Sequence, residues 1–181
     1  NYFKECGCVT TDTRNCPEGS MFIALKGETF NGNAFARQAL EKGCRYAVVD
    51  EPRYADAENI ILVDDCLKTL QNLAREHRRA MGTRIIGITG TNGKTTTKEL
   101  VATVLKQRYN VLYTQGNLNN HIGVPLTLLG LTLDHEMAVV EMGDLQSTAA
   151  SNVAQSLQGR IAGAQFSSQT GAPGEAGTIQ I

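Results

Sequence analysis

Short apolar runs alternate with helical repeats along most of the chain. Leu67, Leu70, Leu73 and Ala74 recur at intervals of three or four residues, which predicts an amphipathic helix that ends near Gly82. Runs rich in Val, Ile and Leu are typical of buried strands, and they occupy residues 21–25, 46–49, 60–63, 111–114 and 137–142. Strands that alternate with helices in this way predict an α/β protein with parallel sheets.

The pattern divides the chain into three parts. A boundary near Gly82 separates a small α/β module, residues 1–82, from a second α/β module, residues 83–143. A parallel sheet that begins at Ile85 needs more strands than this second module offers to be covered on both faces, so we expect the module to be incomplete. Residues 144–181 are rich in Gln, Ser, Ala and Gly, which predicts a disordered tail. A reading-frame change, a truncation and a genuine linker are all compatible with this tail.

Composition narrows the class of protein. Seventeen basic and eighteen acidic residues leave a net charge of -1, so nothing in the charge favours nucleic acid or an anionic membrane as a partner. The five cysteines show no paired metal-ligand spacing, and we expect free thiols. No apolar run reaches the length of a membrane span and no signal peptide opens the chain, so we expect a cytoplasmic protein. We expect it to be a monomer.

A glycine-rich loop carries the clearest chemistry. Residues 87–96 read Gly-Ile-Thr-Gly-Thr-Asn-Gly-Lys-Thr-Thr, between the apolar pair Ile85-Ile86 and a helix-like run at 98–108. Such a loop turns backbone N–H groups toward phosphate oxygens, and the following helix adds its positive end. The glycines fall at 87, 90 and 93, which indicates a variant of the P-loop rather than the strict spacing. We therefore predict ATP binding by Gly90, Thr91, Asn92, Gly93, Lys94, Thr95 and Thr96.

Three side chains in this module suit phosphoryl transfer. Lys94 is placed to reach the outer phosphates, and the Thr95 hydroxyl is placed to bind Mg²⁺. Glu141 ends a predicted strand, and in an open parallel sheet ligands gather at the carboxyl ends of strands. We therefore predict that Glu141 shares one crevice with the loop as a ligand of Mg²⁺ or water. The alternative is a carboxylate that only caps a neighbouring element.

Three motifs of the second module, in order, resemble the central domain of the Mur ligase family: residues 89–96, 116–125 (Gly-Asn-Leu-Asn-Asn-His-Ile-Gly-Val-Pro) and 141–143 (Glu-Met-Gly). In the first module, residues 11–14 (Thr-Asp-Thr-Arg), 19–27 and 31–35 are similar to the UDP-sugar-binding domain of that family. The similarity spans residues 9–143. It implies a small UDP-sugar-binding α/β domain followed by an incomplete P-loop-type, parallel-sheet ATPase domain.

The resemblance also implies a reaction. It is closest to the branch that uses ATP and Mg²⁺ to join D-alanyl-D-alanine to UDP-N-acetylmuramoyl-tripeptide, through an acyl phosphate, in peptidoglycan synthesis. No protein nucleophile is required, because the enzyme holds two reactants in line and stabilises a phosphoryl group. The resemblance assigns catalytic roles to Lys94, Glu141 and Asn117, and metal binding to Thr95 and Glu141.

The remaining predicted contacts concern the UDP-sugar substrate. The resemblance places them at Asp12, Thr13, Arg14, Asn31, Asn119, Asn120 and His121. For Asn119, Asn120 and His121, as for Asn117, it leaves open contacts to the substrate or to a second metal. Asn-rich turns also occur where the side chains only satisfy backbone groups, and a lone histidine is often a packing residue. Residues 31–33 read Asn-Gly-Asn where family members commonly carry Asp-Gly-His.

Two other functions stay open on the sequence. One is a nucleotide or UDP-sugar binding module without catalysis, and the other is a ligase that resembles the folylpolyglutamate synthases. Family members continue beyond Glu-Met-Gly with a second metal site, which includes a carbamylated lysine, and with a further domain. We therefore expect this chain alone to show little or no ligase turnover.

Overall fold

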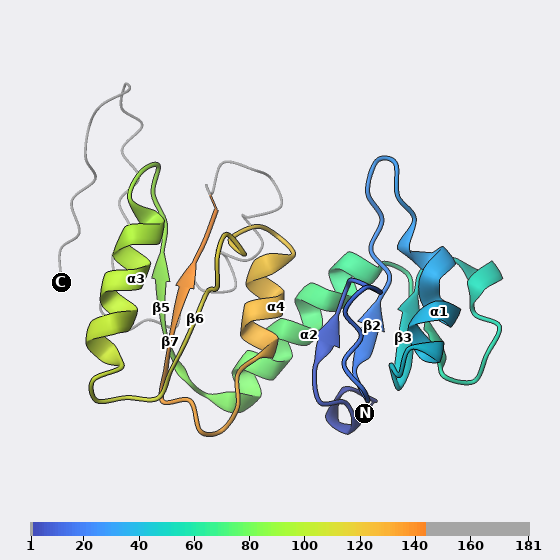
Figure 1. Ribbon diagram of the computed structural model, residues 1–181, viewed down its shortest axis with the longest axis horizontal. Coiled ribbons are helices and arrows are strands. Elements are labelled where there is room, and N and C mark those ends of the chain that lie inside the picture. Colours follow the sequence, from blue (N-terminus) through green and yellow to red (C-terminus); the bar gives the residue numbers. More distant parts are fainter. Residues whose placement is uncertain (1, 144–181) are drawn as a thin grey trace. The chain divides into compact units, whose positions relative to one another are not determined.

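The computed structural model describes residues 2–143, and the predicted tail lies outside them. The described part contains two parallel sheets and the helices that cover them (Figure 1). Every pair of neighbouring strands within these sheets is parallel, which confirms the predicted α/β class. None of the helices in this part has both the length and the apolar character that crossing a bilayer requires.

The first sheet has four strands in the order β1-β2-β3-β4. Its strands and helices, with the 3-10 turns η1–η3, are η1 (Tyr2–Glu5), β1 (Val9–Thr10), β2 (Met21–Ile23), η2 (Gly32–Phe35), α1 (Ala36–Glu41), β3 (Tyr46–Val49), η3 (Pro52–Tyr54), β4 (Ile60–Leu62) and α2 (Cys66–Met81). β2 and β3 form the core, and Phe22, Ile23 and Val49 are almost fully buried. The sequence predicted β2, β3 and β4 within two residues at each end, whereas the two-residue strand β1 is too short to leave a pattern.

Helix α2 shows why its sequence folds locally as predicted. Asp65 begins the helix, because its side chain accepts a hydrogen bond from the Lys68 amide over 2.8 Å. Gly82 ends it in the left-handed conformation, with φ of 67°, and its N–H donates to the Arg78 carbonyl over 3.1 Å. One face of α2 buries Leu70 and Ala74, so the stripe seen in the sequence is the packed face.

The second sheet has three strands in the order β5-β7-β6. Its elements are β5 (Arg84–Ile88), α3 (Lys94–Leu105), β6 (Val111–Tyr113), α4 (Gly123–Leu129) and β7 (Met137–Glu141). Side chains alternate across β7, so Val139 packs with Ala102 and Val111 in the cluster beneath α3. In Figure 1, α3 and α4 lie on opposite sides of this sheet.

Helix α2 also packs against α4 of the second module. The side-chain amide of Gln71 donates to the His121 carbonyl over 3.3 Å, and the His77 ring hydrogen-bonds the Leu131 carbonyl over 2.8 Å. The division into a UDP-sugar domain and an ATPase domain at Gly82 stays a prediction.

The cap of α2 can be tested by substitution. We expect Asp65→Ala to lower the free energy of unfolding by about 1 kcal/mol, because it leaves an amide of the first helical turn without its acceptor. Urea denaturation followed by circular dichroism measures this change. The neighbouring exposed acid provides a control of equal charge, and Asp64→Ala should change stability far less. Equal losses in the two variants would contradict the capping role.

Candidate functional site

The glycine-rich loop lies between β5 and α3, in the strand-loop-helix order that the sequence predicted. Helix α3 begins at Lys94, so the expectation of a helix starting near residue 98 was wrong by one turn. The start is set by Gly93, whose φ of 74° is left-handed, and Gly90 also has a positive φ, 137°. Both values favour glycine, and they allow the chain to turn directly from the strand into the helix.

The amino end of α3 presents positive groups to the loop. Its N-cap residue is Gly93, so no N-cap side chain occupies the first N–H groups of the helix. The Lys94 ammonium donates a hydrogen bond to the Gly90 carbonyl, which holds the side chain over the loop. Backbone amides, a helix dipole and an ammonium group together favour an anion such as a phosphate.

The carboxylate of Glu141 lies beside this helix start and is only 1% exposed. The Thr95 hydroxyl donates to it, at 3.1 Å from each carboxylate oxygen. The side-chain amide of Asn119 donates to the Oε1 atom of Glu141 over 2.9 Å. The backbone amide of Glu141 donates to the Thr114 hydroxyl over 2.9 Å. The structure thus brings together three predicted site residues from α3, β7 and the loop after β6.

Sequence reasoning missed Lys98, a fourth member of this group. Its side chain is 0% exposed, and its Nζ atom lies 3.6 Å from the Oε2 atom of Glu141. The same atom donates to the Gly116 carbonyl over 3.3 Å and lies 3.1 Å from Oε1 of Glu99. A signal was present in the sequence, because Lys98 has helical spacing with the apolar residues that α3 buries.

The chemistry of these side chains suits Mg²⁺. A threonine hydroxyl and a glutamate carboxylate are hard oxygen donors, which is the ligand type that Mg²⁺ prefers, and nucleotide phosphates usually complete such sites. Within residues 2–143, no cluster of three or more His, Cys, Asp or Glu side chains could hold a metal alone. The residues therefore fit an ion that binds together with a nucleotide.

The other polar residues of the loop after β6 make different contacts. Asn120 uses its side-chain oxygen to accept from the amides of Ile122 and Gly123, at 3.0 and 2.8 Å, just before α4. This is the backbone-satisfying arrangement that the sequence left open. Asn117 and His121 are exposed, and their backbone carbonyls accept hydrogen bonds. Their predicted roles in catalysis and substrate binding stay predictions.

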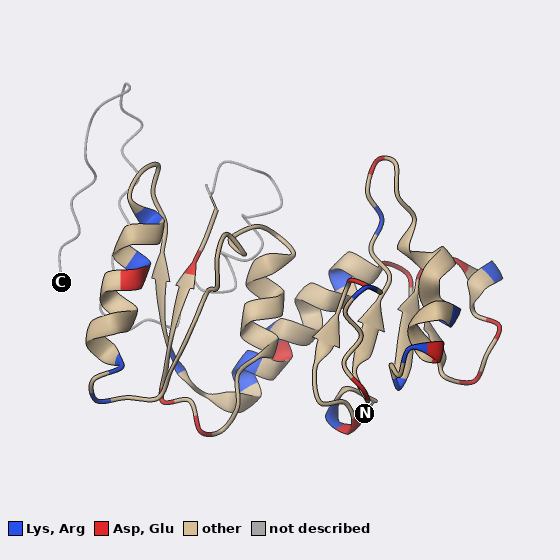
Figure 2. Cartoon of the chain, in the orientation of Figure 1, with Lys and Arg blue, Asp and Glu red and all other residues tan. Residues whose placement is uncertain are grey.

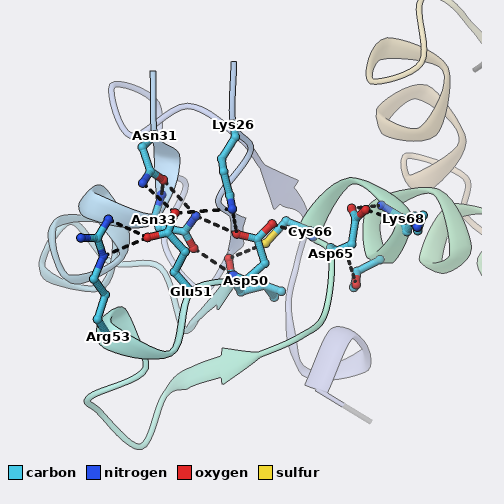
Figure 3. Close-up of polar contacts among 11 residues, drawn as sticks. Lys26, Asn31, Asn33, Asp50, Glu51, Arg53, Asp65, Cys66 and Lys68 are labelled. Atoms are coloured by element: carbon cyan, nitrogen blue, oxygen red, sulfur yellow. Dashed lines mark hydrogen bonds and ion pairs between the residues drawn. The ribbon is translucent and has the colours of Figure 1, made fainter. Parts of the chain in front are cut away.

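In the first module, Asn31 belongs to a polar network at the carboxyl ends of β2 and β3 (Figure 3). We call it the Asp50 cluster; its members are Lys26, Asn31, Asn33, Asp50 and Glu51. Asn33 is 0% exposed and donates to both the Asn31 and the Asp50 side-chain oxygens over 2.9 Å. Asn31 also donates to Glu51 over 2.9 Å, so its side chain is engaged on both sides within the protein.

Asp50 itself connects this cluster to α2. Its Oδ1 atom lies 2.8 Å from the Lys26 ammonium, and its Oδ2 atom accepts from the Cys66 amide over 3.3 Å. Partial burial disfavours the charged carboxyl, yet the hydrogen bonds from Lys26, Asn33 and the Cys66 amide hold the pKa of Asp50 below its usual value. The Asp50 carboxylate is therefore ionised at neutral pH.

The Thr-Asp-Thr-Arg motif forms a local ion pair. The Arg14 guanidinium donates from Nε and Nη2 to Asp12, with a shortest distance of 2.7 Å. These bonds lower the pKa of Asp12 to about 2. The Thr13 carbonyl accepts from the Lys42 ammonium over 2.7 Å. The Arg14 side chain remains 88% exposed, so it is accessible to a ligand in solution.

A cavity of about 650 Å³ lies away from these groups. It is lined by η1, α2 and α4 residues that include Phe3, Leu73, His77 and Leu126, and it contains none of the predicted site residues. The polar groups around Glu141 are the stronger candidate for a site of chemistry, because converging hydrogen bonds orient reacting groups and a largely apolar crevice does not.

Comparison with known proteins agrees with the geometry. The profile described as "Mur ligase family, catalytic domain" matches residues 5–78, and the "Mur ligase middle domain" profile matches residues 88–162. The second match extends beyond Gly143, where we expected the resemblance to end, and so reaches into residues outside the described part.

Individual relatives carry a consistent name. The chain is 48% identical over 137 residues to UDP-N-acetylmuramoyl-tripeptide–D-alanyl-D-alanine ligase of Bacillus subtilis, and 45% identical over 135 residues to the enzyme of that name in Escherichia coli. Each match covers 75% of this chain and 30% of the relative.

A solved structure of a ligase is also similar to this chain. The crystal structure of MurF ligase from Thermotoga maritima in complex with ADP aligns with a TM-score of 0.73 at 31% identity, over 82% of this chain and 35% of that one. The chain thus spans about a third of the length of the proteins it matches. Two adjoining family profiles, these relatives and the phosphate-loop geometry together show that the chain belongs to the Mur ligase family.

Proposed function

We propose that this chain is part of an ATP-dependent ligase that joins D-alanyl-D-alanine to UDP-N-acetylmuramoyl-tripeptide. The observation that carries the proposal is the Thr95 hydroxyl held against the buried Glu141 carboxylate beside the phosphate loop. It supports the use of ATP with a divalent ion. The two substrates to be joined rest on the names of the relatives, of which the chain spans 30%.

The proposed reaction has two displacements. The terminal carboxylate of the tripeptide attacks the γ-phosphorus of ATP, the bond to the bridging oxygen breaks, and ADP leaves. The amine of D-alanyl-D-alanine then attacks the acyl carbon of the resulting acyl phosphate. The carbon–oxygen bond to phosphate breaks, phosphate leaves with the electron pair, and the nitrogen loses a proton as the amide forms. Both steps need charge stabilisation and alignment more than a protein nucleophile.

Residues of this chain supply parts of that stabilisation. The loop amides and Lys94 bind the phosphates, since both present N–H donors at the start of α3. Thr95 and Glu141 hold Mg²⁺, which when bound offsets the negative charge of the phosphates. Asn119 fixes the orientation of the Glu141 carboxylate through its 2.9 Å hydrogen bond.

The first module is the proposed site of the UDP-sugar. Arg14 offers an exposed guanidinium that suits a diphosphate, with Asp12 holding one edge of it. Thr13 and Asn31 lie in the same module, whereas Asn117, Asn119, Asn120 and His121 line the loop of the second module. A cytoplasmic location and a monomeric state are further parts of the proposal.

The phosphate loop can be tested by titration calorimetry with a non-hydrolysable ATP analogue and Mg²⁺. We expect Lys94→Ala to weaken binding roughly ten- to hundredfold, because it removes a charged hydrogen-bond donor from the phosphates. Lys106→Ala provides a matched control, since it removes the same charge just after the other end of α3. Equal binding by the wild type and Lys94→Ala would contradict the proposed nucleotide site.

The Asp12–Arg14 pair makes a prediction about pH. Because the folded-state pKa of Asp12 lies below its ordinary value of 3.8, the pair stabilises the fold above that value and is lost as the pH falls through about 2. We expect an NMR titration of the Asp12 carboxyl to show a midpoint near 2, and a return toward 3.8 in Arg14→Met.

A second arginine serves as the control for this titration. Arg37 makes a comparable exposed pair with Asp56 at 2.6 Å, so Arg37→Met should leave the Asp12 midpoint unchanged. A wild-type midpoint near 3.8 would mean that the pair does not persist in solution.

A further inference from the structure

Lys98 is the most completely buried cation of the described part, and the proposed reaction assigns it no role. Its side chain is 0% exposed, although it lies on a helix whose next residue, Glu99, is half exposed. Burying an ammonium group is costly unless charged and polar partners compensate it. The partners of Lys98 must therefore offset the cost of burying its charge.

Those partners are two carboxylates and one carbonyl. The Nζ atom of Lys98 lies 3.1 Å from the Oε1 atom of Glu99 and 3.6 Å from the Oε2 atom of Glu141. It also donates to the Gly116 carbonyl over 3.3 Å. The Tyr113 ring lies farther off, with its centroid 6.0 Å away. Figure 2 shows the charged residues of α3 on its amino-terminal half, together with the acidic residue of β7.

Of the two carboxylates, Glu141 depends more on Lys98. Glu99 is 52% exposed and can be solvated by water, whereas the Glu141 side chain is 1% exposed. The other partners of Glu141, Thr95 and Asn119, are neutral hydrogen-bond donors. Lys98 thus places a full positive charge 3.6 Å from the Oε2 atom of Glu141.

We propose that Lys98 is a positioning residue that acts as a counter-cation for Glu141, so that this carboxylate binds a divalent ion weakly until a nucleotide brings further ligands. The inference rests on the proposed function, because it assumes that Thr95 and Glu141 form the Mg²⁺ site. A positive charge 3.6 Å from the carboxylate repels a second cation in a poorly solvated site. The phosphates of ATP outweigh this repulsion, which couples binding of the ion to binding of the nucleotide.

The test measures Mn²⁺ binding to the full 181-residue chain without nucleotide, from the free-ion signal in electron paramagnetic resonance. We expect weak binding by the wild type and at least roughly tenfold tighter binding by Lys98→Met, which keeps the volume and removes the charge. Lys98→Arg, which retains the charge, should bind as weakly as the wild type. Adding Glu141→Gln to Lys98→Met should abolish the gain.

A control separates this local effect from a change in net charge. Lys106→Met makes the same change in net charge just beyond the carboxyl end of α3, and it should leave Mn²⁺ binding unchanged. Circular dichroism reports whether each variant is folded. If Lys98→Met does not fold, Lys98→Gln makes the same charge change and keeps a donor for the Gly116 carbonyl.

Two results would overturn the inference. One is a folded neutral variant whose Mn²⁺ affinity equals or falls below that of the wild type. The other is micromolar Mn²⁺ binding by the wild type without nucleotide, which needs no variant to detect. Failure of the proposed function has a different signature, since the wild type would then bind no ATP analogue even with Mg²⁺ present.

Discussion

The position of β7 between β5 and β6 is the constraint on which the candidate site depends. Parallel pairing on both sides brings the carboxyl ends of the three strands to one edge of the sheet. Because β7 is central, Glu141 at its end lies between the phosphate loop that follows β5 and the Asn-rich loop that follows β6. The hydrogen bonds that Glu141 accepts from Thr95, 46 positions earlier in the chain, and from Asn119, 22 positions earlier, follow from this order of strands.

A buried carboxylate at such a position must be compensated. The structure does this with two neutral donors and one ammonium group, which come from α3 and from the loop before α4. Neutral donors orient the oxygens, while the ammonium offsets the charge. In the first module, the charge of Asp50 is compensated differently. Asp50 is partly exposed to solvent, and it shares the Lys26 ammonium with Glu51.

Much of this arrangement could be predicted from the sequence. Residues 87–96 indicated the loop because glycine spacing and the Lys-Thr pair reflect local backbone chemistry. The strands β2, β3, β4, β6 and β7 left clear apolar runs, and β5 left the apolar pair Ile85-Ile86 before the loop. The start of α3 was placed one turn late, because Lys94, Thr95 and Thr96 are polar and do not extend the apolar stripe. Lys98 was missed although its spacing from Ala102 places it on the buried face of α3, because the partners that compensate its charge, Gly116 and Glu141, are distant in sequence.

Helix α2 takes part in hydrogen-bond networks of both modules. At its amino end, the Cys66 amide donates to Asp50. Farther along, Gln71 and His77 bond to the carbonyls of His121 and Leu131, on either side of α4. Because the same helix bonds to the Asp50 cluster and to the Asn-rich loop, a change that tilts the axis of α2 would displace both groups together.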